Sequence, residues 1–340
     1  MRSDRRGRRR ALPILPLLVA LLAGAATPAA RAQTIFACEP EWAALTRVLL
    51  PAARLHVATH AQQDPHHIEA RPALIAQLRG ADAAICTGAG LESGWLPTLQ
   101  QRAGNPRVQD GAPGLFLAAS ATTLIDARPG AGGNPFAGDV HAEGNPHLQA
   151  DPRRLLAVAA AWSTRLQQLF PAQQAAIAQR HQAFAARWGG RIAGWEGRAA
   201  PLRGQAVAAQ HGHFAYLWAW LGLRQVADLE PRPGMAPTPG HLQHLLAQLR
   251  GQAPLAIVTS SHQDPRAARW LARQLGGRVP VLALPGTVDE PEAPDALGRW
   301  FDQLLDGLLA AAQPQPPADA TSPPRPPDPA PPATHRPGPA

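Results

Sequence analysis

Histidine is the residue type in this sequence that could carry chemistry, because 13 histidines stand in a chain without lysine. A neutral imidazole can bind a transition metal through a ring nitrogen, and it can also move a proton near neutral pH. His66 (QQDPHH), His147 (GNPH) and His211 (QHGHF) each stand where a strand-like run or a loop gives way to a helical stretch. Ligand sites of α/β sheets gather at such positions. Each histidine alone is better explained as a solvated turn residue, so only their joint pattern could indicate a site.

The segments around these histidines alternate short β-like runs with amphipathic stretches. This pattern predicts an α/β fold of βα units on largely parallel sheets. The expected strands are 34–38, 54–58, 83–86, 205–210, 226–229, 256–259 and 279–283. The expected helices are 40–50, 71–79, 92–102, 213–221, 239–250, 264–275 and 293–311. Residues 127–146 are rich in Gly and Pro and predict a long loop.

The stretch from 151 to 200 is dominated by Ala, Leu, Gln and Arg, which predicts helices. Pro171 divides it into one helix of about 18 residues and a second of about 27 that begins at this proline, a favoured first-turn residue. The second helix would span ~40 Å, more than one small domain needs. It therefore predicts a connection between an N-terminal α/β lobe (33–150) and a C-terminal α/β lobe (201–312).

The basic charge of the chain is concentrated at its N-terminus. Residues 1–32 carry seven arginines and one acid, which accounts for +6 of the net charge of +8. No phosphate-binding surface is implied elsewhere, and we expect no nucleic-acid partner. The Arg-rich start, the apolar run 11–26 and Ala30-Arg31-Ala32 predict a signal peptide cleaved before Gln33, and so export to the periplasm. A membrane anchor is the alternative, although the run is short of the ~20 residues that span a bilayer.

Two further features depend on export and composition. Cys38 and Cys86 each end an apolar strand-like run, so on neighbouring parallel strands they could meet as a disulfide in an oxidising compartment. Two buried free thiols are the alternative. The segment 313–340 is rich in proline and lacks large apolar residues, which predicts a disordered tail.

Four groups of residues occur in an order typical of one family. They are DPH (64–66) with GADAAICTGAGLESGWL (80–96), GNPHLQADP (144–152), HGHFAYLWAWLGL (211–223) and DPRAARWLARQLGGRVPVL (264–282). Together they resemble the periplasmic metal-binding substrate-binding proteins of zinc and manganese ABC transporters, over residues 34 to about 311. The resemblance implies a monomer with two α/β lobes joined by one long helix, a metal cleft between the lobes, and an inner-membrane ABC permease as partner.

The same resemblance implies which residues bind the metal. His66 and His147 would be the ligands from the N-terminal lobe, and His211 the ligand from the C-terminal lobe. The family usually adds a carboxylate after the last strand, but this chain has LPG (284–286) at the nearest positions. We expect Asp289 as the fourth ligand, with Glu292 or water as alternatives.

The ligand types favour zinc. Three imidazoles with a carboxylate or water suit tetrahedral Zn²⁺, whereas manganese prefers more oxygen ligands. Mn²⁺ is the less favoured cargo, because its binding proteins carry a carboxylate where this chain has His211. The remaining candidates are expected around the ligands, as supporting or alternate residues: Asp64, which could orient the ring of His66, and His67, His141, His213 and His262.

Two other functions compete with metal transport. A secreted zinc hydrolase also holds zinc with three histidines and an open position, but the chain has no HExxH, and HHIEA (66–70) lacks the final His of HxxEH. A surface adhesin or scaffold on the same fold is the second alternative, with the Pro-rich tail as its contact. We expect a binding protein and no enzyme.

Overall fold

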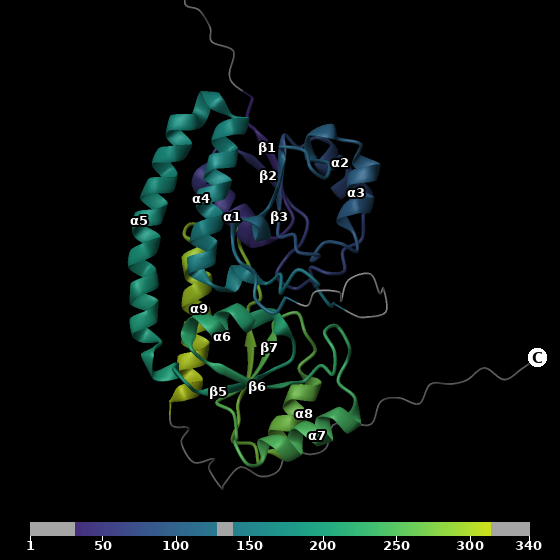
Figure 1. Ribbon diagram of the computed structural model, residues 1–340, viewed down its shortest axis with the longest axis vertical. Coiled ribbons are helices and arrows are strands. Elements are labelled where there is room, and N and C mark those ends of the chain that lie inside the picture. Colours follow the sequence, from purple (N-terminus) through teal and green to yellow (C-terminus); the bar gives the residue numbers. More distant parts are fainter. Residues whose placement is uncertain (1–30, 128–138, 314–340) are drawn as a thin grey trace, which may run out of the picture. The chain divides into compact units, whose positions relative to one another are not determined.

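The computed structural model describes residues 31–127 and 139–313, and strands alternate with helices along them (Figure 1). The predicted signal peptide and Pro-rich tail lie almost entirely outside these residues, as does most of the predicted Gly/Pro-rich loop. In the described part of the chain, no helix is both long and apolar enough to cross a membrane. The predicted α/β class is confirmed, with two parallel four-stranded sheets.

The first sheet forms the centre of the N-terminal lobe. Its order is β2-β1-β3-β4, with β1 (Thr34–Ala37), β2 (Arg54–Val57), β3 (Ala83–Cys86) and β4 (Leu115–Leu117), all parallel. The inner strands β1 and β3 are fully buried, as expected for parallel strands covered by helices on both faces. The helices are α1 (Pro40–Leu49), α2 (Pro72–Arg79) and α3 (Leu96–Ala103). Strand β4 was not predicted from the sequence.

The second sheet forms the centre of the C-terminal lobe. Its order is β6-β5-β7-β8, with β5 (Ala206–Ala209), β6 (Arg224–Asp228), β7 (Ile257–Ser260) and β8 (Val281–Leu284). The strands are again parallel, and the inner strands β5 and β7 are buried throughout. The helices are α6 (Ala215–Leu221), α7 (Pro239–Leu249), α8 (Arg266–Gln274) and α9 (Ala296–Ala312).

Two long helices connect the sheets. α4 (Pro152–Leu169) begins at Pro152, and the side chain of Asp151 caps it by accepting from the Arg153 N–H at 2.9 Å. After a single 3₁₀ turn, α5 (Gln174–Arg198) continues for 25 residues, close to the predicted length. Figure 1 shows α5 running beside α4 and then beside α9, and it packs against both. One helix thus contacts elements of both lobes.

The lobes also share one hydrophobic core. A single buried cluster includes Ile35 and Trp162 from the N-terminal side and Trp218 and Phe301 from the C-terminal side. The aromatic contacts of α5 lie within it, since the rings of Trp188 and Phe301 are 5.6 Å apart. Separating the lobes widely would expose this apolar surface to water, at a free-energy cost of about 25 cal/mol per Å². We therefore expect only small adjustments of the cleft when a ligand binds.

The predicted disulfide is confirmed. β1 and β3 are parallel neighbours in the register Ala37↔Ile85, so the next residue of each strand lies directly opposite the other. Cys38 and Cys86 occupy these positions, with their Cα atoms 4.8 Å apart, and form the bond. The alternative of two free thiols is excluded.

Three buried glutamates surround the end of this disulfide and the start of α1. Glu92 accepts a hydrogen bond from the Thr87 N–H at 2.6 Å, and Glu39 accepts one from the Thr87 hydroxyl at 3.0 Å. The other oxygen of Glu39, Oε1, has no hydrogen-bond partner among the described residues. Glu41 accepts a hydrogen bond from Thr287 of the C-terminal lobe. Burial raises the pKa of Glu41 and the pKa of Glu92 to about 7 each. Burial and the neighbouring carboxylates raise the pKa of Glu39 well above its usual value.

These raised pKa values predict a pH-dependent stability. The folded chain keeps protons that an unfolded glutamate releases near pH 4.5, so the glutamates stabilise the fold less as pH rises from about 5 to 8. Glu39→Gln removes one charge, and its amide can still accept from Thr87 while donating to Glu92. We expect this variant to exceed the parent in free energy of unfolding by on the order of 1–2 kcal/mol at pH 8, and by less at pH 5.

Urea unfolding of both proteins at the two pH values measures this difference. Glu69→Gln, which removes an exposed carboxylate, is the matched control and should show no such gain at pH 8. A Glu39→Gln variant that is destabilised equally at pH 5 and pH 8 would contradict the prediction.

Candidate metal centre

His66 lies on the loop that follows β2, in a turn set by Asp64 and Pro65. The Asp64 Oδ1 accepts the His66 backbone N–H at 3.0 Å and lies 2.7 Å from the His66 Nδ1. Burial alone would raise the pKa of Asp64, but the hydrogen bonds and charge of His66 hold it well below its usual range. The ionised carboxylate fixes the proton on Nδ1, so the lone pair of His66 lies on Nε2, the atom that could bind a metal ion. Asp64 therefore orients the ring, as the sequence suggested.

His147 lies between the loop that ends at Pro146 and the first turn of α4. Its backbone N–H donates to the Asn145 Oδ1 at 2.9 Å, and its side chain is 1% exposed. Neither ring nitrogen has a hydrogen-bond partner among the residues that the structure describes. Burial, followed by the neighbouring histidines, lowers the pKa of His147 well below its usual value. A neutral, buried and unpartnered imidazole is unfavourable by about 1–3 kcal/mol unless a ligand satisfies it.

His211 lies two residues after the end of β5, at the carboxyl edge of the second sheet. Its Nδ1 lies 2.7 Å from the Glu230 Oε2, which also accepts the Gly234 N–H at 2.8 Å. Burial lowers the pKa of His211, but the hydrogen bond and charge of Glu230 outweigh it and leave the pKa raised. This arrangement repeats that of Asp64 and His66, so Nε2 is again the atom that could bind a metal ion. Sequence reasoning missed Glu230, although its place two residues after β6 marks it as a residue of the same sheet edge.

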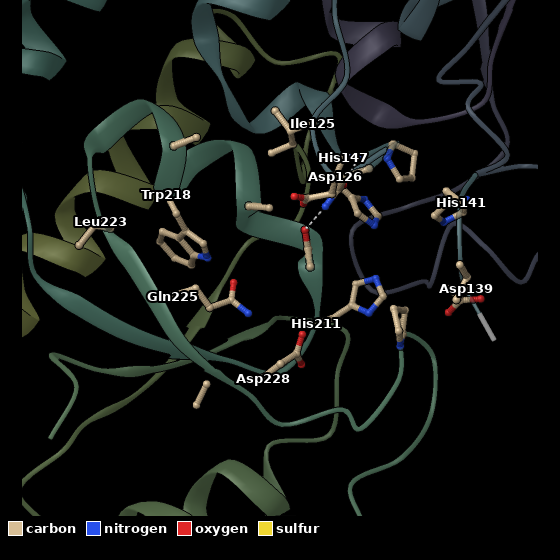
Figure 2. Close-up of a pocket in the computed structure, with 18 of the residues that line it drawn as sticks. Ile125, Asp126, Asp139, His141, His147, His211, Trp218, Leu223, Gln225 and Asp228 are labelled. Atoms are coloured by element: carbon tan, nitrogen blue, oxygen red, sulfur yellow. Dashed lines mark hydrogen bonds between the residues drawn. The ribbon is translucent and has the colours of Figure 1, made fainter. Parts of the chain in front are cut away.

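The three histidines converge. The ring centroids of His66, His147 and His211 are separated by 5.3, 5.4 and 5.7 Å, and their ligand atoms lie within 4.8 Å of one another. Figure 2 shows His147 and His211 beside the same hollow, a cavity of about 760 Å³. Nitrogens around a tetrahedral Zn²⁺ are about 3.3–3.4 Å apart, so an ion needs only small shifts of these rings. Three imidazoles in a buried triangle can hold a borderline-soft divalent cation once their ligand nitrogens carry no proton.

His141 lies next to this triangle. Its Nε2 is 3.2 Å from the Nε2 of His66, close to the spacing of two ligands on one tetrahedral ion. Burial lowers the pKa of His141 to about 4, with a further contribution from His66. The ring of His141 is therefore neutral at physiological pH. If the Nε2 atoms of His66 and His141 bind the same ion, neither of them carries a proton.

His213 and His262 lie next to the triangle and line one cavity with His66 and His211. The Nε2 of His213 donates to the Gly286 carbonyl at 2.8 Å, and its ring centroid is 4.3 Å from that of His147. Burial lowers the pKa of His213 to about 3. The Nδ1 of His262 lies 3.0 Å from the Ser260 hydroxyl. Both rings are therefore occupied by protein partners and support the neighbouring residues.

The structure does not bring the expected carboxylates to the triangle. Asp289 is exposed beyond β8, and Glu292 pairs with Arg47 at the surface. Packing explains this, because a Cβ added to Gly286 would lie 2.5 Å from the Ser260 hydroxyl and 2.7 Å from the His213 Nε2. Ser260 and His213 therefore fill the space in which a side chain at position 286 would lie. His67 faces solvent, with a side chain that is 70% exposed.

The chain resembles known proteins in sequence and in fold. The family described as "Zinc-uptake complex component A periplasmic" (ZnuA) matches residues 35–311. A ZnuA crystal structure is similar with a TM-score of 0.67 and 19% identity, over 81% of this chain and 99% of that chain. A zinc-bound ZnuA deletion mutant gives 0.67 and 20%, over 84% and 100%. FpvC of Pseudomonas aeruginosa in complex with Mn²⁺ gives 0.64 and 19%, over 83% and 99%. The comparison with curated proteins gives no match.

Proposed function

The chain belongs to the ZnuA family of periplasmic metal-binding proteins, and we propose that it captures Zn²⁺ between its lobes and delivers the ion to an ABC permease. His66, His147 and His211 are the ligands in this proposal, and His141 completes a tetrahedral site. The observation that carries it is the buried triangle of imidazoles. Carboxylates orient two of them, and the third has no hydrogen-bond partner within residues 31–127 and 139–313.

The ligand set supports zinc as the cargo. Four imidazole nitrogens suit Zn²⁺, while Mn²⁺ selects carboxylates, carbonyls and water. Solved relatives are described with zinc, manganese, nickel or cadmium, so the fold alone does not set the metal. For this chain the choice follows from its own side chains, in particular from His211 and from His141 in place of an acid.

The mechanism is capture followed by transfer. An ion entering the cleft replaces the unfavourable burial of His147 with a metal–nitrogen bond, and it joins His66 and His147 to His211 of the other lobe. The shared core keeps the lobes close, so small ring movements complete the site. We infer a periplasmic protein that releases the ion to the permease rather than to solvent.

The arrangement favours binding over catalysis. The carboxylates in contact with the ligand rings, Asp64 and Glu230, hold those rings in place and are thus not free to activate a water molecule. With His141 as the fourth ligand, the position that a catalytic zinc keeps open for water would be filled. The ZnuA family consists of solute-binding proteins, which fits this role.

The test is a metal titration of untagged protein beginning at Gln33. We expect one tightly held Zn²⁺ after purification in zinc-containing buffer, and we expect equimolar Mn²⁺ to leave it in place during competition. Elemental analysis and competition with a chromophoric chelator measure both quantities. A protein that retains no zinc, or that exchanges it for equimolar Mn²⁺, would show the proposal to be wrong.

A further inference from the structure

Asn145 stands two residues before His147, in the sequence GNPH that precedes α4. Its side-chain Oδ1 accepts the backbone N–H of His147 at 2.9 Å, an arrangement typical of an Asn that opens a turn. Its Nδ2 donates to the backbone carbonyl of Gly212 at 2.8 Å. Only one orientation of the amide satisfies both contacts, because exchanging its two ends would set N–H against N–H and oxygen against oxygen. One side chain thus holds the backbone of an N-terminal ligand and reaches the residue that follows His211.

Tyr216 of α6 holds the backbone of Asn145 from the C-terminal lobe. Its hydroxyl donates to the Asn145 carbonyl at 2.7 Å and accepts the Ile125 N–H at 3.1 Å. The Asn145 N–H donates in turn to the Ile125 carbonyl at 2.8 Å. The packing is close here, since a Cβ added to Gly144 would be 2.8 Å from the Ile125 carbonyl, and the φ of +133° at this residue also favours glycine. Asn145 is therefore fixed at its backbone as well as at its side chain.

His147 depends on this support more than the other two ligands do. Carboxylates orient the rings of His66 and His211, but the ring of His147 has no hydrogen-bond partner among the described residues. The place of His147 is therefore set by its backbone, whose N–H is bonded to Asn145. The contact from Asn145 to Gly212 joins residues 67 apart in the chain and crosses from one lobe to the other. It fixes the spacing of two ligands directly, rather than along the path through α4 and α5.

We propose that Asn145 is a positioning residue that bridges the lobes, sets the spacing of His147 and His211, and thereby slows the release of zinc. The inference rests on the proposed function, because it concerns the same site. Without the bridge, the backbone at His147 and the turn after His211 move independently, and zinc binding must first order them at a cost in free energy. Zinc leaves when its ligands separate, and the bridge opposes that separation. Its loss therefore accelerates release more than it slows capture.

Asn145→Ser separates the bridge from the local turn, in the protein from Gln33 onward. A serine hydroxyl can still accept the His147 N–H, but it is too short to reach Gly212. Stopped-flow transfer of zinc to a chromophoric chelator should show release about tenfold faster for Asn145→Ser than for the parent, the effect of losing one hydrogen bond. Asn145→Ala loses both bonds and should release zinc at least as fast. Tyr216→Phe removes the hydroxyl that holds Asn145 and should accelerate release by a smaller factor.

Asn105 provides the matched control, because it makes the same kinds of bond away from the metal centre. Its Oδ1 accepts the Arg107 N–H at 3.1 Å. Its Nδ2 donates to the carbonyls of Leu78 and Ala81 at 2.9 and 2.8 Å. Asn105→Ser should lower the free energy of unfolding of the metal-free protein and yet release zinc at the parent's rate. The visible absorption of Co²⁺ bound in place of zinc reports the ligand geometry, and it should change in Asn145→Ser but not in Asn105→Ser.

Failure of the bridge can be separated from failure of the metal centre. A parent that retains no zinc overturns both. A parent that retains zinc, together with an Asn145→Ser variant that releases it at the same rate, overturns only the bridge. Release that is accelerated equally in Asn105→Ser would trace the effect to a general loss of stability and would also overturn the bridge. If neither variant of Asn145 folds, Tyr216→Phe decides the question, since unchanged release in that variant overturns the bridge.

Discussion

Replacing His147 with alanine is expected to weaken zinc binding by about 100- to 1000-fold while the protein stays folded. A structural zinc site contributes about 10–16 kcal/mol, so each of four ligands is worth roughly 2.5–4 kcal/mol. The fold should tolerate the change because both ring nitrogens of His147 lack partners, and the substitution removes two unsatisfied buried atoms. The loss is then confined to the metal, with little change in the unfolding of the metal-free protein.

A graded comparison separates a ligand from a residue that orients one. Glu230→Gln keeps an acceptor for the His211 Nδ1 but loses its charge, and it should weaken zinc binding by about 10- to 100-fold. His244→Ala should bind as the parent does. Competition with a chromophoric chelator measures all three variants on one scale. If His147→Ala binds zinc as tightly as the parent, the buried triangle is not the metal centre.

His66, His147 and His211 could be selected from the sequence because each stands where a strand or a loop is followed by a helix. His211 lies two residues after β5 and His66 stands in the loop after β2. Parallel strands of βα units bring such positions to one edge of a sheet. The resemblance then grouped His147 with them. The structure adds what no spacing contains, namely that the three rings face one hollow and that two carboxylates fix their orientation.

The fourth position could not be predicted in the same way. Asp289 was expected because related proteins carry a carboxylate after the last strand, but here His213 occupies the space beside Gly286. That contact joins residues 73 apart in the chain, and local patterns do not report such packing. His141 belongs to a Gly/Pro-rich stretch without periodicity, so its approach to His66 was equally hidden.

The missing strand has a local cause. β4 is only three residues long, and Leu115–Leu117 gives too short an apolar run to show a period of two. It is positioned by Gly114, where a Cβ would lie 2.4 Å from the Arg107 carbonyl. The strand therefore depends on a close approach of backbones rather than on its own side chains. Strands β1 and β3 of the same sheet were predicted because their buried apolar runs are longer and end at the two cysteines.

The Cys38–Cys86 bond gives the second large expected effect, since its removal should cost about 4 kcal/mol of stability. The bond closes a loop with a sequence separation of 48, and the chain-entropy relation for a loop of this length gives about 4 kcal/mol at 25 °C. The double variant Cys38→Ala/Cys86→Ala should therefore unfold at a lower urea concentration than the parent. Reduction of the parent with dithiothreitol should produce a similar loss, because it removes the same constraint from the unfolded chain.

The m value distinguishes this entropic effect from damage to the folded core. An unfolded chain without the cross-link is more expanded and exposes more surface, so the m value of the double variant should rise as its midpoint falls. Loss of packing alone would lower the midpoint with the m value unchanged, and reductant would then have little effect on the parent. Both cysteines are fully buried between β1 and β3, and the bond constrains the two strands whose connecting segment carries His66. A double variant as stable as the parent, together with a parent whose unfolding is unchanged by reductant, would show that this cross-link does not constrain the unfolded chain.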